Sequence, residues 1–306
     1  MAPEDGEEAD RLLKHADLAL YAAKANGRGT YQFFEPQMDA RAKARRALEF
    51  DLREAIMCGG FEVYYQPIVE TGRGVVVGYE ALLRWLHPTR GMISPSEFIP
   101  LAEETGLINQ LGEWVLTTAC RDAAGWPLDL KVAVNVSPVQ IKSPGLVLNV
   151  VRILAESGLH ACRLELEMTE TVLIQDDEAA LSVLHHLRDL GVRIAMDDFG
   201  TGFSSLSYLH RFPFDKIKID RCFIKNLPDD IGSEATIKAI IGIAKARNIT
   251  TTAEGVETEE QKTILCALGC DQIQGFLISA ARPASELAFA LGGPAGRRAA
   301  GHRAWR

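Results

Sequence analysis

Residues 163–197 read RLELEMTETVLIQDDEAALSVLHHLRDLGVRIAMD, and this stretch decides the fold. Two short runs of alternating apolar residues, 163–168 and 193–197, predict buried strands. Between them, the spacing of the leucines in 179–190 predicts an amphipathic helix. A strand, a helix and a second strand in this order form the repeating unit of a parallel sheet. The region is therefore expected to have an α/β fold.

The same alternation extends from about residue 45 to residue 276. About eight strands are predicted, the number in a closed (β/α)8 barrel. The first two are joined by residues 70–74 alone, too few for a crossover helix, so they should form an antiparallel hairpin. We expect a TIM-like (β/α)8 barrel with an antiparallel first strand pair. The predicted strands are 62–69, 75–84, 131–136, 163–168, 193–197, 216–220, 250–254 and 272–276, with helices at 96–104, 113–124, 146–157, 179–190, 234–247 and 258–268.

The two ends of the chain differ from this pattern. Residues 11–24 carry leucine and alanine at helical spacing, and a short extended run, 30–34, follows two glycines. One helix and one strand cannot bury themselves, so this piece should be the end of a domain whose body is missing. Residues 293–306, rich in Gly, Ala and Arg, should form a disordered tail. The expected domains are thus 1–40 with a linker helix, the barrel at 41–292, and the tail.

Composition narrows the function classes. The chain is 47% hydrophobic and 24% charged, the balance of an ordinary globular protein. No apolar run approaches the roughly 20 residues of a membrane helix, and the acidic N-terminus is unlike a secretory signal. We expect a cytoplasmic protein without a membrane segment, although a membrane-tethered parent stays open. The net charge of −8 argues against binding to a nucleic acid polymer.

Polar side chains recur at the carboxyl ends of the predicted strands. Alternate residues of a barrel strand face inward, and barrel enzymes keep their sites at these ends. Strand 163–168 places Glu165 and Glu167 on one side, opposite the leucines. Several strands should therefore deliver polar groups to one mouth; the others in phase are Glu80 with Leu82 and Arg84, Asn135, Asp197, Lys218 with Asp220, Glu254, and Gln274.

Crowded carboxylates resist ionisation unless a cation neutralises them. Oxygen ligands without His or Cys favour magnesium, manganese or calcium over zinc or copper. The adjacent Asp197 and Asp198 fit a site with two ions, because one aspartate can bridge both. A single glutamate at a strand end is more often a solvated cap or a salt-bridge partner, so the metal hypothesis depends on the whole set. The sequence predicts a shared acidic metal site.

The segment Phe199-Gly-Thr-Gly-Phe-Ser-Ser-Leu206 follows the two aspartates directly. Its glycines permit tight turns and its hydroxyls can hold a phosphate or a carboxylate. We interpret it as a flexible gate. Glu170 is placed to anchor this loop, with a helix N-cap as the alternative role.

Ordered motifs along the chain show a family resemblance. They are Tyr65-Gln-Pro-Ile68, Glu80-Ala-Leu-Leu-Arg84, PSEFIPLAEETG at 95–106, Asn135-Val-Ser137, Glu167-Met-Thr-Glu170, DDFGTGFSSL at 197–206, Lys218-Ile-Asp220, Ala253-Glu-Gly-Val-Glu257 and Gln274-Gly-Phe276. In this order they resemble the EAL-domain family of cyclic di-GMP phosphodiesterases over nearly all of residues 45–292. Residues 13–28 look like the closing helix of a GGDEF diguanylate cyclase domain, without a GG(D/E)EF signature.

The resemblance implies hydrolysis of cyclic di-GMP to linear pGpG with two divalent cations, Mg²⁺ or Mn²⁺, Ca²⁺ being inhibitory. It implies a homodimer, and upstream GGDEF and sensory domains in the parent protein. Lys218 is either the base or an electrostatic stabiliser. The implied metal ligands are Glu80, Asn135, Glu167, Asp197, Asp198 and Glu254; the catalytic residues Lys218, Glu80, Asp197 and Gln274; the substrate-binding residues Gln66, Leu82, Arg84, Asp220 and Glu257; and the loop anchor Glu170.

Two alternatives and one departure accompany this interpretation. An inactive EAL module that binds cyclic di-GMP as a receptor is the main alternative, and a two-metal phosphodiesterase for other nucleotides is the second. The departure is Ala280-Ala281, which stand where family members usually carry a basic residue and a proline. It touches no implied metal ligand.

Overall fold

The computed structural model describes residues 8–25, 29–172, 178–201 and 211–287. The chain divides into two compact units. Met1–Phe61 with Trp85–Leu111 form the first, here called the helical unit, and Glu62–Arg84 with Gly112–Arg306 form the second, the barrel unit. The predicted tail at 293–306, the glycine at 27 and the gate beyond Thr201 lie outside the described residues.

The helical unit contains α1 (Ala9–Ala25), α2 (Pro36–Cys58) and α3 (Pro95–Thr105). Pro36 stands in the first turn of α2, where its missing N–H costs nothing, and Gly59 ends the helix at φ 91°. A short strand, β3 (Gly91–Ile93), pairs antiparallel with the end of β2 (Val76–His87). The core of the unit includes Trp85 and Phe98, whose rings meet edge to face at 5.4 Å.

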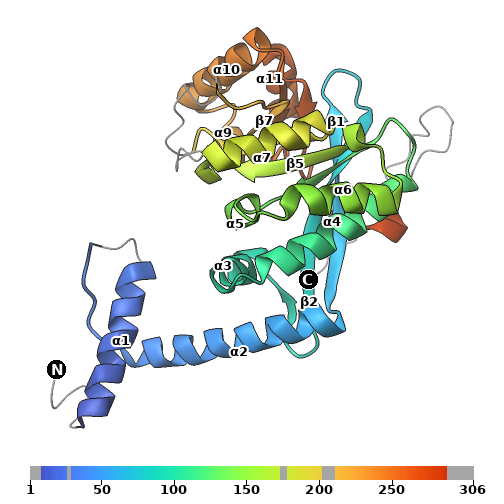
Figure 1. The fold of residues 1–306 in the computed structure, drawn as a ribbon. Helices are drawn as coiled ribbons and strands as arrows, with labels where there is room; N and C mark the ends of the chain where they lie inside the picture. The colour runs from blue at the N-terminus through green and yellow to red at the C-terminus, as the bar shows by residue number, and fades with distance from the viewer. Residues whose placement is uncertain (1–7, 26–28, 173–177, 202–210, 288–306) are drawn as a thin grey trace. The chain divides into compact units, whose positions relative to one another are not determined.

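Two parts of the helical unit differ from the sequence prediction. Residues 30–34 form no strand; instead the Phe34 ring stacks on that of His15 at 3.6 Å. The 23-residue helix α2 was expected only as a linker within residues 1–40, yet it runs on to Cys58 (Figure 1). The proposed domain boundary at 40/41 therefore falls inside a continuous helix.

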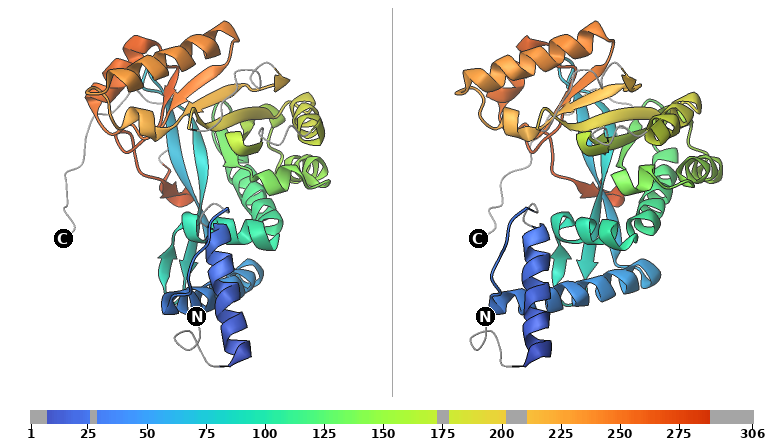
Figure 2. Two further views of the ribbon diagram at one scale, coloured as in Figure 1. Left: turned by 90° about the vertical axis from the view of Figure 1, so that its left-hand side faces the viewer. Right: turned by 60° about the vertical axis from the view of Figure 1, so that its left-hand side comes forward.

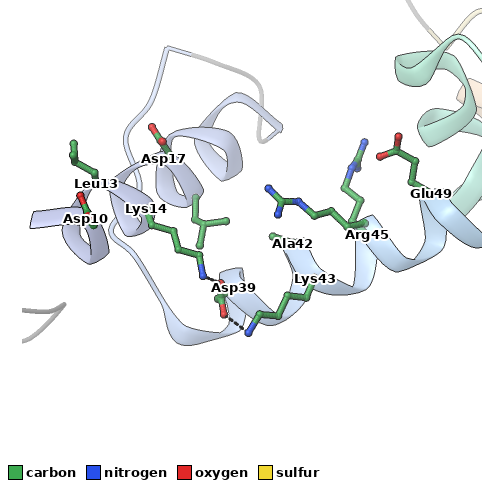
Figure 3. Close-up of a pocket in the computed structure, with 11 residues that line it drawn as sticks. Asp10, Leu13, Lys14, Asp17, Asp39, Ala42, Lys43, Arg45 and Glu49 are labelled. Carbon is green, nitrogen blue, oxygen red and sulfur yellow. Dashed lines mark ion pairs between the residues drawn. The ribbon is translucent and has the colours of Figure 1, made fainter. Parts of the chain in front are cut away.

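A pocket of about 620 Å³ lies between α1 and α2 (Figure 3). Asp39 Oδ1 and Oδ2 accept from Lys14 and Lys43 at 2.7 and 2.9 Å. These hydrogen bonds, that from Lys14 first, lower the pKa of Asp39 to about 2. Lys14 of α1 thus pairs with Asp39 across the two helices, and Lys43 pairs with the same carboxylate within α2.

The barrel unit is built on a closed ring of strands. β2, β4 (Lys131–Asn135), β5 (Leu164–Thr169), β6 (Arg193–Phe199), β7 (Lys216–Ile219), β8 (Thr250–Ala253) and β9 (Gln272–Ile273) run parallel in chain order. β1 (Phe61–Glu70) closes the ring by pairing with β2 and, antiparallel, with β9. Since β2 and β9 run the same way, β1 is antiparallel to both. The predicted TIM-like barrel with an antiparallel first pair is confirmed.

Helices flank this ring of strands (Figure 1; Figure 2). They are α4 (Ile108–Ala124), α6 (Leu146–Ser157), α7 (Glu178–Asp189), α10 (Ile231–Ala246) and α11 (Glu259–Leu268), with the short pieces α5 (Pro138–Ile141), η1 (Ala161–Arg163), η2 (Glu170–Val172), α9 (Arg221–Ile224) and η3 (Ala284–Glu286). Leu166, Ile194 and Ile217 belong to the fully buried apolar core of the unit. Each such side chain contributes about 1.5–3 kcal/mol, which holds the strands in the register that positions the polar groups.

A last two-residue strand, β10 (Arg282–Pro283), pairs antiparallel with β1 at Tyr64 and Tyr65. It follows the Ala280-Ala281 departure directly. Among the helices that the structure describes, none is long and apolar enough to span a membrane.

Candidate active site

Glu80 on β2 accepts hydrogen bonds from residues at the ends of two other strands. The side chain is 5% exposed. Asn135, on the neighbouring β4, donates from Nδ2 to Glu80 Oε1 at 2.7 Å. Gln274, one residue after β9, donates from Nε2 to Oε2 at 2.6 Å. Burial opposes ionisation of Glu80, but Lys218 and these two amides outweigh it, so its pKa is lowered. Glu80 is a fixed carboxylate.

Lys218 on β7 lies among four carboxylates and is 1% exposed. Its Nζ is 2.7 Å from Glu167 Oε2 and 2.5 Å from Glu254 Oε1. Asp197 Oδ1 is 3.3 Å away and Glu80 Oε2 is 3.5 Å away. Burial disfavours the ammonium, but the surrounding carboxylates, Asp197 first, raise the pKa of Lys218 well above its usual value. The lysine is therefore charged.

One ammonium cannot stabilise all of this negative charge. Burial raises the pKa of Glu167 well above its usual value despite Lys218, and Glu80 and Asp197 add to the effect. Burial likewise raises the pKa of Glu254 to about 8, against Lys218 and with Asp197 and Glu80 adding to it. Carboxylates with raised pKa values gain from an added cation.

A bulge in β6 turns two consecutive aspartates into the site. The β6–β7 register shifts between Met196 and Phe199, and Asp198 has a left-handed φ of 54°. In a straight strand, Asp197 and Asp198 would point to opposite sides. Here one oxygen from each, together with one from Glu254, lie within 4.8 Å of one another, a group that could hold a metal ion. Strand alternation in the sequence indicated Asp197 alone.

The residues present fit a divalent cation. Glu167 Oε1 is buried, and among the described residues it has no hydrogen-bond partner. A buried carboxylate oxygen without a partner is costly, so it favours an ion that it can bind. The cluster offers carboxylate and amide oxygens, the ligands that Mg²⁺ and Mn²⁺ prefer.

Gln66 and Gln274 form a bridge beside the carboxylates. Gln274 Nε2 also donates to Gln66 Oε1 at 3.0 Å, and Gln66 Nε2 donates to the Ser279 carbonyl at 3.1 Å. Gln274 is 3% exposed, and its Oε1 is buried without a partner in the described part of the chain. Gln66, expected to line the substrate groove, is held here against Gln274.

Arg84 is placed at the end of β2 next to an aromatic ring. Its guanidinium lies 5.6 Å from the Tyr64 ring centroid, and Nη1 donates to the Leu83 carbonyl at 3.0 Å. Burial lowers its pKa, but arginine stays charged in proteins. Leu82, two residues earlier on the same strand, is half-buried. Tyr64 was not among the expected site residues.

The remaining expected residues lie at the edge of the cluster or apart from it. Asp220 caps α9 by accepting from the Cys222 amide at 2.9 Å. Burial, Asp197 and Asp220 together raise the pKa of Asp198 to about 6. Glu257 is exposed, and no described hydrogen bond or ion pair joins its carboxylate to the cluster. Glu170 is buried at the start of η2, while the loop it was expected to anchor lies outside the described residues.

Comparison with known proteins gives the family. Residues 49–281, more than half of the chain, match the EAL domain. The chain belongs to the EAL domain family. An uncharacterized signaling protein of Caulobacter vibrioides is 50% identical over 93% of this chain and 35% of its own length. Cyclic di-GMP phosphodiesterase PdeR of Escherichia coli is 40% identical over 93% of this chain and 43% of its length.

The EAL domain chain thus spans about a third to two fifths of the length of these relatives. Among solved structures, "PaMucR Phosphodiesterase, c-di-GMP complex" is 45% identical, with a TM-score of 0.76 over 78% of this chain and 99% of that one.

Proposed function

We propose that this EAL domain hydrolyses cyclic di-GMP to linear pGpG with two divalent cations, Mg²⁺ or Mn²⁺. The observation that carries the proposal is the set of four carboxylates, two buried and two half-buried, around the buried Lys218 at the barrel mouth. The similarity to a phosphodiesterase solved with c-di-GMP supports it.

The proposed ligands fall into two overlapping groups. Glu80, Asn135, Glu167 and Asp197 would hold one ion, and Asp197, Asp198 and Glu254 the other. When bound, the ions supply a water activated for attack on phosphorus and charge stabilisation for the phosphate. Ca²⁺, with its looser geometry, is expected to inhibit.

The protein side chains then orient the reactants. The Lys218 ammonium, already charged, donates to the oxygen on which negative charge develops. The Oε1 of Gln274, which has no partner within the described ranges of the chain, accepts a hydrogen bond from the attacking water. Arg84 binds a phosphate of the substrate through its planar guanidinium, and Leu82 lies along the same face of β2. Asp220 acts through Asp198, whose pKa it helps to raise. Glu257 acts at the rim of the groove.

Product analysis tests this function. The protein is mixed with cyclic di-GMP and Mg²⁺, with an EDTA control and the Glu80→Ala and Asp197→Asn variants. Metal-dependent pGpG that is lost in both variants is expected. Tight binding of unchanged cyclic dinucleotide would instead make the domain a receptor, and turnover of other cyclic nucleotides would move the assignment to a different substrate. An Asp197→Asn variant with near-parent kcat contradicts the ligand assignment.

The N-terminal segment is proposed to be the closing part of a GGDEF domain, ahead of the EAL domain at 41–292. The matched region of the relatives extends over 285 residues or more, beyond the EAL match at 49–281. Deleting residues 1–34, which keeps α2 and its N-cap Glu35, should leave kcat within about twofold, because the proposed site lies wholly in the barrel unit. A large loss of kcat would assign this segment to the EAL domain itself.

A homodimer is also proposed, through surfaces near the Asp197-Asp198 segment and the helix that follows it. Light scattering over a hundredfold concentration range should show the dimer mass. A monomer at the highest concentration would contradict it.

A further inference from the structure

A second buried ion pair lies beneath the one described above. Lys216 Nζ pairs with Glu165 Oε1, and the two side chains are 5% and 1% exposed. Arg193 Nε lies 3.4 Å from Glu165 Oε2. Glu165 and Lys216 each stand two residues before a member of the Glu167–Lys218 pair. The same two strands, β5 and β7, are therefore joined by ion pairs at two successive levels.

These strands are not neighbours, because β6 lies between them. β6 carries Arg193 in register with Glu165; two residues further on it carries Ala195, which is paired in register with both Glu167 and Lys216 and is fully buried. Its methyl group is small enough for the side chains of Glu165 and Lys216 to meet. The Glu165–Lys216 ion pair thus joins β5 and β7 directly through their side chains, across the intervening strand β6.

The Glu165–Lys216 ion pair lies just before the point where the register between β6 and β7 becomes irregular. β6 and β7 pair regularly at Ala195–Lys216 and Met196–Ile217, and the register then shifts before Phe199–Ile219. Lys218 falls within this irregular stretch. On its β8 side Lys218 pairs in register with Thr252, but no register pair joins it to β6, the strand that lies between it and Glu167.

We propose that Glu165 and Lys216 are positioning residues that fix β5 against β7 beneath the bulge and thereby hold Glu167 and Lys218 in place for metal binding and hydrolysis. This inference rests on the proposed function for its catalytic readout. A buried ion pair is often replaceable by apolar residues of similar volume without loss of stability. Stability alone therefore does not account for this ion pair, whereas precise placement of the two active groups does.

The test compares four variants with the unaltered protein. Glu165→Leu/Lys216→Met removes both charges and keeps the volume. Lys216→Gln keeps a hydrogen-bond donor without charge, and Lys216→Arg is the conservative rescue. Leu184→Ala, fully buried on α7, is the control for general destabilisation. The measurements are melting temperature, kcat and KM for cyclic di-GMP, and the calorimetric dissociation constant of Mn²⁺.

The double variant should fold, with kcat reduced at least tenfold, KM within twofold, and Mn²⁺ bound at least fivefold more weakly. Lys216→Gln should also lower kcat and weaken Mn²⁺ binding. Lys216→Arg should keep at least a third of the parent kcat. Leu184→Ala should lower the melting temperature and leave kcat unchanged. If the double variant folds and keeps the parent kcat and Mn²⁺ affinity, the proposal is overturned. If the double variant does not fold, the same result in Lys216→Gln overturns it. If the unaltered protein hydrolyses nothing, the Mn²⁺ constants still decide it.

Discussion

Lys218 Nζ lies 2.7 Å from Glu167 Oε2, with both side chains almost completely buried. The two residues come from β7 and β5, on either side of β6. The ammonium therefore occupies the centre of the group that is proposed to bind divalent ions. If ions are bound there as proposed, they would share with the ammonium the carboxylates of Glu80, Glu167, Asp197 and Glu254.

Replacing Lys218 by Met should separate its two effects. Hydrolysis should fall by about 100-fold or more, the loss typical of a donor aimed at developing charge. Mn²⁺ binding at pH 8 should persist, because removal of a nearby positive charge relieves repulsion of the ion. Lys262→Met, which breaks a surface pair with Glu259, is the matched control. Parent-like kcat in Lys218→Met would exclude the lysine from the mechanism.

Ion binding should strengthen as the pH rises. The pKa of Glu254 is about 8 and that of Asp198 about 6, so below these values an ion must displace protons to gain its ligands. We expect the dissociation constant of Mn²⁺ to fall by about tenfold per pH unit between pH 6 and 8. Calorimetry in two buffers of different ionisation enthalpy counts the released protons. A constant independent of pH would mean that Glu254 is not a ligand.

Stability of the metal-free protein should change with pH in the opposite direction. The pKa of Glu254 is raised from 4.5 to about 8 in the folded state, so its contribution is complete below about pH 4.5 and is lost as pH rises through about 8. The melting temperature should therefore be lower at pH 8.5 than at pH 6, and Mn²⁺ should reverse the loss. Glu254→Gln should flatten this dependence. An unchanged slope in that variant would show that other groups cause it.

Gly275 should tolerate no side chain. A Cβ there would lie 2.2 Å from the Val256 carbonyl oxygen and 2.3 Å from its nitrogen. Gly275→Ala should cost about 3 kcal/mol or more of unfolding free energy and lower kcat, because Gln274 and Leu277 form backbone hydrogen bonds with Val256. Gly242→Ala in α10, where a Cβ meets nothing within 4 Å, should stabilise by about 0.5–1 kcal/mol. Denaturant titration compares the two; equal stabilities would contradict the close approach.

Strand alternation alone could indicate much of the site. Glu80, Asn135, Glu167 and Asp197 were expected on inward positions of separate strands, and the structure brings all four together. This works because side chains alternate with a period of two in regular strands.

Features that depart from regular strand geometry could not be predicted from strand alternation. The inward turn of Asp198 depends on a bulge, which no residue pattern in β6 specifies. The Glu165–Lys216 pair joins two strands that lie on either side of β6, a contact between residues 51 positions apart in the sequence that no local pattern indicates. The length of α2 was missed because nine of its 23 residues are charged and only Leu48, Leu52 and Ala55 are buried, so its apolar spacing is weak.

The reversed direction of β1 decides where the chain enters the barrel. Since β1 runs against every other strand of the ring, its first residues lie at the same end as the last residues of β2 to β8, the end that carries Glu80, Asp197 and Lys218. In an all-parallel barrel the first strand would begin at the opposite end. The chain therefore joins the barrel unit on the side that carries the candidate site, so a reporter dye attached at the first residues of β1 is expected to respond to binding of the proposed nucleotide substrate.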